Sequence, residues 1–135
     1  MKSEIEFMCI SEDSNLPEVG EYFLKEIKSS VVEYSKKGEY SINKKGLKSK
    51  MKNRNSSLIV TVIDEESNRY NEILVEMLSI YKHFQNYFST IEKIADFQVN
   101  FYEHDGYAFS FEFSTEVLQK LEEAGFSLPV SCYRY

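Results

Sequence analysis

The feature that most constrains the fold is a long apolar stripe at helical spacing that follows a short run of β-branched residues. The run Leu58–Ile63 is apolar on both faces, which predicts a central strand over 57–64. The steps of three and four residues in the stripe place its side chains along one side of a helix. The stripe comprises Tyr70, Ile73, Leu74, Met77, Ile80, Tyr81, Phe84 and Phe88. A buried strand followed by a helix with one apolar side predicts a fold in which helices pack on a sheet.

Alternating apolar residues predict further strands on both sides of this unit. Glu4–Ser11 is expected to be the first strand, Val31–Ile42 an extended segment with a turn or bulge, and Leu128–Tyr135 the last strand. Two alternating runs flank the turn sequence Asp105-Gly106, which predicts a β-hairpin. These runs are Phe97, Val99, Phe101 and Tyr107, Phe109, Phe111, Phe113.

Capping residues predict where the helices begin and end. Asn15, with Pro17 in the first turn and Glu18 as the capping-box acid, predicts one helix start, and Asn68 predicts the start of the longest helix. A second capping box at 89–92 predicts a break and a short helix to about Ala95. The last helix is expected to begin after Ser114 and to stop at Gly125, with Phe126 folding back on Leu121.

The expected element order is therefore βαββαββαβ in one domain over residues 1–135. We predict an α+β fold with ferredoxin-like layering, in which the helices pack on one face of a mostly antiparallel sheet. The 135 residues suffice for one domain with its own core. The other face is expected to be solvated or to bind a partner, because it carries polar strand residues. These are Glu6, Gln98, Asn100, Ser110 and Glu112.

Charge is distributed unevenly along the chain. Between Lys36 and Arg54, eight basic residues stand against one acid, Glu39, which gives this segment a charge of +7. The whole chain carries −6, so the remainder carries −13. The polar, glycine-containing part at 43–57 is expected to be a mobile loop. Its cations are the strongest candidates for contact with a partner or a polyanion: Lys44, Lys45, Lys48, Lys50, Lys52 and Arg54.

Other residues give little support to catalysis or metal binding. His104 lies between two acids at the expected hairpin tip, where three such side chains could hold a metal, but a solvated turn explains them. His83 lacks a second histidine four residues away, and no nucleophile motif or phosphate-binding glycine loop is present. We therefore predict no catalytic residue, no metal, no cofactor and no enzyme activity.

The compartment is predicted from the cysteines and from the hydropathy pattern. Cys9 and Cys132 are far apart and outside any metal-ligand spacing, so we expect two buried thiols in a reducing compartment. If the first and last strands were neighbours, the two thiols could approach each other. No secretion signal or membrane-length apolar run is found. A cytoplasmic location is expected.

Three stretches of the sequence resemble a bacterial family known only as domain of unknown function 4279. They are Ile10–Glu18 after the first strand, Lys36–Glu39 in the middle, and Phe113–Leu121 running through Gly125 into the strand that closes on Tyr133. A Trp often opens the central strand in that family, where this chain has Leu58 or a neighbour. The resemblance implies no catalytic residues, and some relatives look like immunity proteins found beside secreted bacterial toxins.

The leading hypothesis from the sequence is a protein-binding module, an immunity-type protein whose partner is another protein, namely a toxin. An acidic body would attract a basic toxin, because opposite potentials speed association. The alternative is a nucleic-acid-associated protein that uses the basic segment 36–54. An enzyme with an unfamiliar site is the third hypothesis.

Overall fold

The computed structural model describes residues 1–11, 15–43, 45–86 and 93–135, with the backbone alone at 93 and 94. The main sheet consists of β1 (Lys2–Ser11), β2 (Val31–Ser35), β5 (Ser56–Asp64), β6 (Lys93–Glu103) and β7 (Val130–Arg134). The described helices are α1 (Leu16–Glu26), α2 (Tyr70–His83) and α4 (Thr115–Ala124). The strands β3 (Tyr40–Ile42) and β4 (Lys48–Lys52) form a separate two-stranded sheet. None of the described helices is long and apolar enough to cross a membrane.

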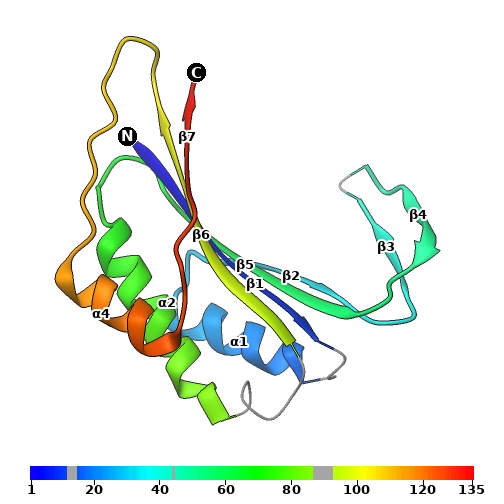
Figure 1. Ribbon diagram of the computed structural model, residues 1–135. Coiled ribbons are helices and arrows are strands. Elements are labelled where there is room, and N and C mark those ends of the chain that lie inside the picture. Colours follow the sequence, from blue (N-terminus) through cyan, green and yellow to red (C-terminus); the bar gives the residue numbers. More distant parts are fainter. Residues whose placement is uncertain (12–14, 44, 87–92) are drawn as a thin grey trace.

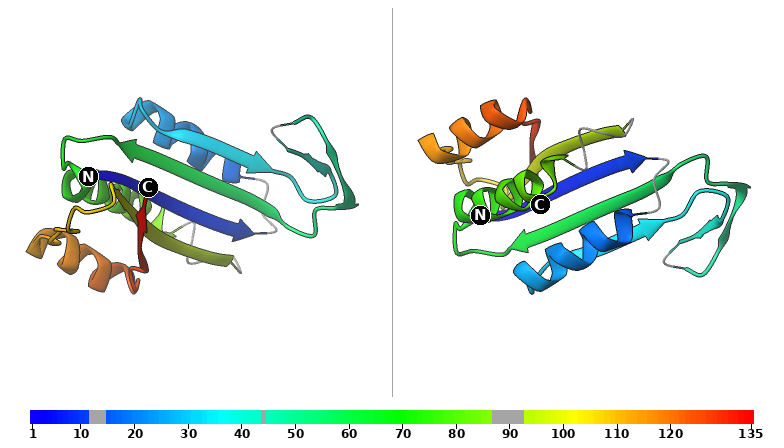
Figure 2. Two further views of the ribbon diagram at one scale, coloured as in Figure 1. Left: turned by 90° about the horizontal axis from the view of Figure 1, so that it is seen from above. Right: turned by 90° about the horizontal axis from the view of Figure 1, so that it is seen from below.

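The five-stranded sheet has the order β2-β5-β1-β6-β7, with β1 in the middle. Neighbouring strands are antiparallel except β6 and β7, which are parallel. The helices lie on one face of this sheet, and the β3–β4 hairpin extends beyond its end (Figures 1 and 2). The predicted α+β class with a mostly antiparallel sheet is confirmed. The predicted element order βαββαββαβ is wrong, because the described elements follow the order βαββββαβαβ.

The core lies between the sheet and the helices and is built around phenylalanine rings. In β1, Ile5, Phe7 and Cys9 are fully buried while their neighbours in sequence are half-buried, as the alternation predicted. The Phe7 ring lies 5.4 Å from that of Phe23 in α1 and 4.9 Å from that of Phe97 in β6, measured between centroids. Such contacts join the first helix to the middle of the sheet.

The α4 helix has the predicted ends. The Ser114 hydroxyl accepts a hydrogen bond from the Val117 amide (3.3 Å), which satisfies one of the free donors of the first turn. Gly125 has φ 75°, a left-handed conformation that glycine adopts without steric cost. The Phe126 amide then donates to the Leu121 carbonyl (2.9 Å), so the chain folds back at the helix end.

The α2 helix begins differently from the prediction. Asn68 is not its cap, because its φ of 54° is left-handed and Arg69 occupies the capping position. The Asp64 carboxylate, at the end of β5, accepts hydrogen bonds from the Ser67 amide (3.3 Å), the Ser67 hydroxyl and the Arg69 amide (2.8 Å). The last residue of the strand therefore holds the turn that leads into the helix.

The predicted hairpin over 97–113 is wrong in its second half. Residues 107–114 form no strand, and the place beside β6 is taken by β7, with Val99 opposite Val130. The Phe111 ring instead stacks on that of Phe101, 4.4 Å away between centroids. The alternation of aromatic residues reflects this packing, which does not require a ladder of backbone hydrogen bonds. The predicted short helix cannot extend to Ala95, because residues 93–95 lie in β6; its start at 89–92, like Phe88, lies outside the described residues.

The segment predicted as a mobile loop over 43–57 contains strand β4 and the start of β5. Lys48 lies opposite Ile42 and Lys52 opposite Tyr40. The turn between β3 and β4 is held by the Asn43 side chain, which accepts hydrogen bonds from the amides of Lys45 and Leu47 (both 2.9 Å). We call residues 36–54 the basic arm. Its mobility stays a prediction, but the prediction that 43–57 is a loop is wrong, because β4 pairs with β3 there.

Candidate functional site

The face of the five-stranded sheet that no described helix covers carries acids beside aliphatic side chains. We call this surface the open face. In the row that crosses its middle, Met8 lies opposite Ile59 on one side and Asp96 on the other, and Glu33 lies opposite Ile59. Glu6 belongs to the next row, and Glu4 to the row after it. Acids from three strands therefore surround two apolar side chains.

The acids of the open face repel one another. Partial burial and the negative charges of Glu4, Asp96 and Glu33 raise the pKa of Glu6 above its usual value. Within the described ranges, the ion pairs join Met1 to Glu103 and Arg69 to Glu72, so none of the four acids is paired with a described cation. No direct ion pair to a described cation offsets the negative charge of these four acids.

One end of the open face is aromatic. The rings of Tyr102 in β6 and Tyr133 in β7 stack at 5.2 Å between centroids, and the Lys2 ammonium lies 5.4 Å from the centre of the Tyr102 ring. Burial, followed by the charge of Glu4, raises the pKa of Tyr102. Tyr133 is 47% exposed, so this end offers an accessible aromatic surface next to the acids.

The base of the basic arm is tied together by Asn53. Its amide donates to the Glu39 carbonyl (2.8 Å), and its carbonyl accepts from the Gly38 amide (2.9 Å). Its side chain donates to the Lys36 carbonyl (3.1 Å) and accepts from the Ser41 hydroxyl (2.7 Å). Because one residue makes four hydrogen bonds to the facing segment 36–41, the arm leaves the body with a defined geometry. A wide hollow of about 630 Å³ lies beside this base.

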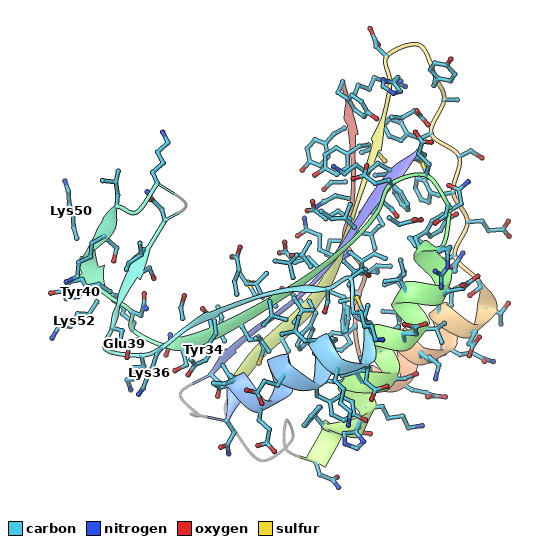
Figure 3. All side chains as sticks on the ribbon, turned by 180° about the vertical axis from the view of Figure 1, so that it is seen from behind. Tyr34, Lys36, Glu39, Tyr40, Lys50 and Lys52 are labelled. Carbon is cyan, nitrogen blue, oxygen red and sulfur yellow. The ribbon has the colours of Figure 1, made fainter. Side chains whose placement is uncertain are left out.

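The arm gathers part of the predicted cationic cluster on one side. Lys48 and Lys52 lie opposite Ile42 and Tyr40, which share one side of β3, and Lys50 lies on the same side of the arm as Lys52 (Figure 3). Tyr40 lies opposite Lys52, and its ring centre is 4.4 Å from the Lys48 ammonium and 5.9 Å from that of Lys52. In Figure 3, Tyr40, Lys50 and Lys52 lie on the outer side of the arm, away from the sheet.

The remaining predicted cations lie at the ends of the arm. Lys45 is in the turn between β3 and β4, and Arg54 is in the bend between β4 and β5. Lys44 lies outside the described residues. The cluster predicted from the sequence is therefore divided, and three lysines on one strand are its ordered centre.

The histidines pack on tyrosine rings, and the two cysteines differ in burial. His104 packs on Tyr135 (4.2 Å between ring centroids) and His83 stacks on Tyr22 (4.6 Å). In the part of the chain that the structure describes, no three His, Cys, Asp or Glu residues are grouped to hold a metal. The prediction of two buried thiols is wrong for Cys132, which is exposed. Because β6 separates β1 from β7, the first and last strands are not neighbours.

The sequence identified only part of the open face. Gln98 and Asn100 were assigned to it correctly together with Glu6, but Ser110 and Glu112 lie in the irregular segment before α4. There the Glu112 amide donates to the Tyr70 hydroxyl (3.0 Å). The acids Glu4, Glu33 and Asp96 were missed as a group. Strict alternation along the strands would have found Glu4 from Glu6 and Asp96 from Gln98. Glu33 comes close only through the pairing of β2 with β5, and a sequence does not show which strands pair.

Comparison of the chain with protein-family models, with curated proteins and with solved structures found no match. The resemblance to domain of unknown function 4279 therefore stays a prediction.

Proposed function

We propose that this protein is a protein-binding module, and more specifically an immunity-type protein that neutralises a bacterial toxin by covering its active surface. The observation that carries the proposal is the open face, where Glu4, Glu6, Glu33 and Asp96 gather and none of them forms an ion pair with a described cation. The repulsion among these carboxylates is unfavourable in the isolated chain, and a cationic partner would reduce it.

The composition of the open face supports a protein partner over a small molecule. Exposed tyrosines such as Tyr133 are common at the energetic centres of protein interfaces, because they bury a large area with few rotatable bonds. Met8 and Ile59 provide an apolar surface between the acids. A basic protein could bury these side chains while its lysines or arginines pair with the carboxylates, and the opposite potentials would speed association.

The identity of the partner as a toxin rests on the sequence resemblance and on the acidic charge outside the arm. A cytoplasmic location belongs to the same proposal, since an immunity protein must meet its toxin where the toxin would act. The prediction that the chain is not an enzyme is part of it as well.

Affinity capture from the native cell lysate tests the proposal, with nuclease added to remove bridging nucleic acid. The face variant carries Glu4→Lys, Glu6→Lys and Glu33→Lys. A matched control carries Glu21→Lys, Glu26→Lys and Glu76→Lys, which make the same charge change at exposed positions on the helices. We expect a single basic protein to be retained by the wild type and the control and to be lost by the face variant. Retention by the face variant, or no partner tighter than micromolar, would refute the proposal.

The alternative is a nucleic-acid-associated protein that uses segment 36–54. It is supported by the position of Lys48, Lys50 and Lys52 on one side of the arm with Tyr40. Binding of an oligonucleotide would weaken steeply with added salt and disappear in Lys48→Gln/Lys50→Gln/Lys52→Gln. Absent or salt-insensitive binding would rule this alternative out. The −13 charge of the rest of the chain weighs against it.

A finer description of the fold is part of the proposal. The unit β1-α1-β2-β5-α2-β6, in which β1 lies between β5 and β6 and β2 flanks β5, supports ferredoxin-like layering. In this description β7 and the basic arm are additions to the unit.

A further inference from the structure

The basic arm is a poorly covered element of the described chain. Every residue of β4 is exposed, and three apolar side chains of the arm are open to solvent: Ile42 (70% exposed), Leu47 (63%) and Met51 (65%). A two-stranded hairpin is only marginally stable in water unless something packs against it. The arm nevertheless has a fixed base, because the side chain of Asn53, which follows β4, hydrogen-bonds to Lys36 and Ser41 on the opposite side of the arm. These observations favour an arm that is built to be covered by a partner.

The outer side of the arm specifies the chemistry of that partner. Lys48, Lys50 and Lys52 project from the same side of β4, and none of them forms an ion pair with an acid that the structure describes. Ile42 and Tyr40 lie opposite Lys48 and Lys52 and add an apolar and an aromatic group to this side. The matching surface would carry carboxylates around aliphatic side chains.

The open face has that composition. Glu6, Glu33 and Asp96 lie around Met8 and Ile59, and these acids have no cation partner among the described residues. The two surfaces are thus complementary in charge and in apolar content. They cannot meet within one molecule, because the lysine side of the arm points away from the sheet of its own chain (Figure 3). A second molecule is required.

A second copy fits this requirement better than a nucleic acid. The segment 36–54 carries +7 and the remainder of the chain −13, so a polyanion on the arm would be repelled by the body, whereas another copy presents an acidic surface to the arm. Every copy also carries both surfaces, so each can donate an arm and receive one.

We infer that the protein self-associates, with the basic arm of one copy seated on the acidic open face of another. The inference shares the open face with the proposed function, so the arm and a basic partner would compete for the same acids. Self-association would then keep the open face covered until a partner with stronger positive charge displaces the arm.

A reciprocal charge exchange tests the inference. The arm variant carries Lys48→Glu, Lys50→Glu and Lys52→Glu, and the face variant carries Glu4→Lys, Glu6→Lys and Glu33→Lys. The molar mass of each is measured by analytical ultracentrifugation at low salt, with circular dichroism to verify folding. We expect wild type to reach at least twice the mass of one chain and to dissociate as salt is added, because screening shortens the range of the charges. Each variant alone should be monomeric, and their equimolar mixture should associate again.

The outcomes separate this inference from its alternatives. A monomeric wild type, an arm variant that still associates, or a mixture that stays monomeric would overturn it. If a charge-reversed variant does not fold, the neutral sets Lys48→Gln/Lys50→Gln/Lys52→Gln and Glu4→Gln/Glu6→Gln/Glu33→Gln should each weaken association. A monomeric wild type that binds an oligonucleotide through the arm would overturn the inference in favour of nucleic acid. Partner capture that survives in the arm variant would preserve the proposed function even then.

Discussion

The two faces of the five-stranded sheet differ in what their side chains do. Phe7 and Met8 are adjacent in β1, yet Phe7 is fully buried among aromatic rings while Met8 lies half-buried beside Ile59 and Asp96. The covered face holds the molecule together through packing. The open face adds little packing of its own and concentrates like charges, which is the pattern expected of a surface kept for binding at some expense of stability.

The pKa values of two carboxylates, Asp64 and Glu6, shift in opposite directions. Burial alone would raise the pKa of Asp64, but hydrogen bonds from the Ser67 side chain and from the amides of Arg69 and Ser67 lower it below its usual value. Burial and neighbouring acids raise the pKa of Glu6 instead. The charge of Asp64 therefore stabilises the fold at neutral pH, and the charge of Glu6 opposes it.

The largest effect should come from the covered face. Replacing Phe7 with Ala removes a ring that contacts those of Phe23 and Phe97, and we expect a loss of about 3 to 5 kcal/mol in the free energy of unfolding. Met8→Ala, one residue along the same strand, should cost less than about 1.5 kcal/mol. Urea denaturation of both variants measures the difference. Equal losses would show that the open face is packed as tightly as the covered one.

The next effect concerns the turn into α2. Asp64→Asn should lower the free energy of unfolding by about 1 to 2 kcal/mol at neutral pH, because it weakens charge-assisted hydrogen bonds to two backbone amides. The folded pKa lies below the unfolded one, so the carboxylate stabilises above the unfolded pKa and loses this effect as pH falls through the folded pKa. The difference from wild type should shrink in acid, and Glu65→Gln should cause no such change. A difference independent of pH would contradict the assignment.

A smaller and local effect is expected in the basic arm. Asn53→Ala removes two side-chain hydrogen bonds, each contributing about 0.5 to 1.5 kcal/mol, at the junction of the arm with the body. Amide hydrogen exchange should accelerate in β3 and β4 while the global unfolding transition changes little. Asn55→Ala, at an exposed position nearby, is the control. Faster exchange throughout the main sheet would mean that the arm and the body unfold as one unit.

The smallest effect is a shift in one titration. In the variant Glu4→Gln/Glu33→Gln/Asp96→Asn, the pKa of Glu6 should fall towards its usual value because the negative neighbours are gone. It should not fall completely, since burial is the largest cause of the shift and remains. Carboxyl chemical shifts followed by NMR over a pH series measure it. An unchanged pKa would mean that the acids of the open face do not interact.

Local sequence signals predicted the elements whose stability is local. The cap at Ser114, the left-handed Gly125 and the alternation of β1 need only their own neighbours, and all were found as predicted. The hairpin over 97–113 failed because alternation cannot tell whether a strand pairs or packs. The C-terminal strand β7 pairs with the edge of β6 where the second half of the hairpin was expected. No residue between 97 and 113 indicates that pairing.

The candidate site was predictable only in part for the same reason. The cations of the arm are contiguous in the sequence and were identified together, although their strand was not, because lysines and serines are weak strand formers. The acids of the open face come from three strands far apart in the chain. Their proximity depends on strand order and register, which no single segment encodes.

The free energy of unfolding of Glu6→Gln/Glu33→Gln/Asp96→Asn at neutral pH tests most directly whether the open face is kept for binding. These substitutions preserve side-chain size and remove only charge. If the acids serve a partner, the monomeric variant should be more stable than monomeric wild type, because the repulsion that raises the pKa of Glu6 is relieved. A variant that is less stable than wild type would show that these carboxylates hold the fold together, and would contradict the binding role proposed for the face.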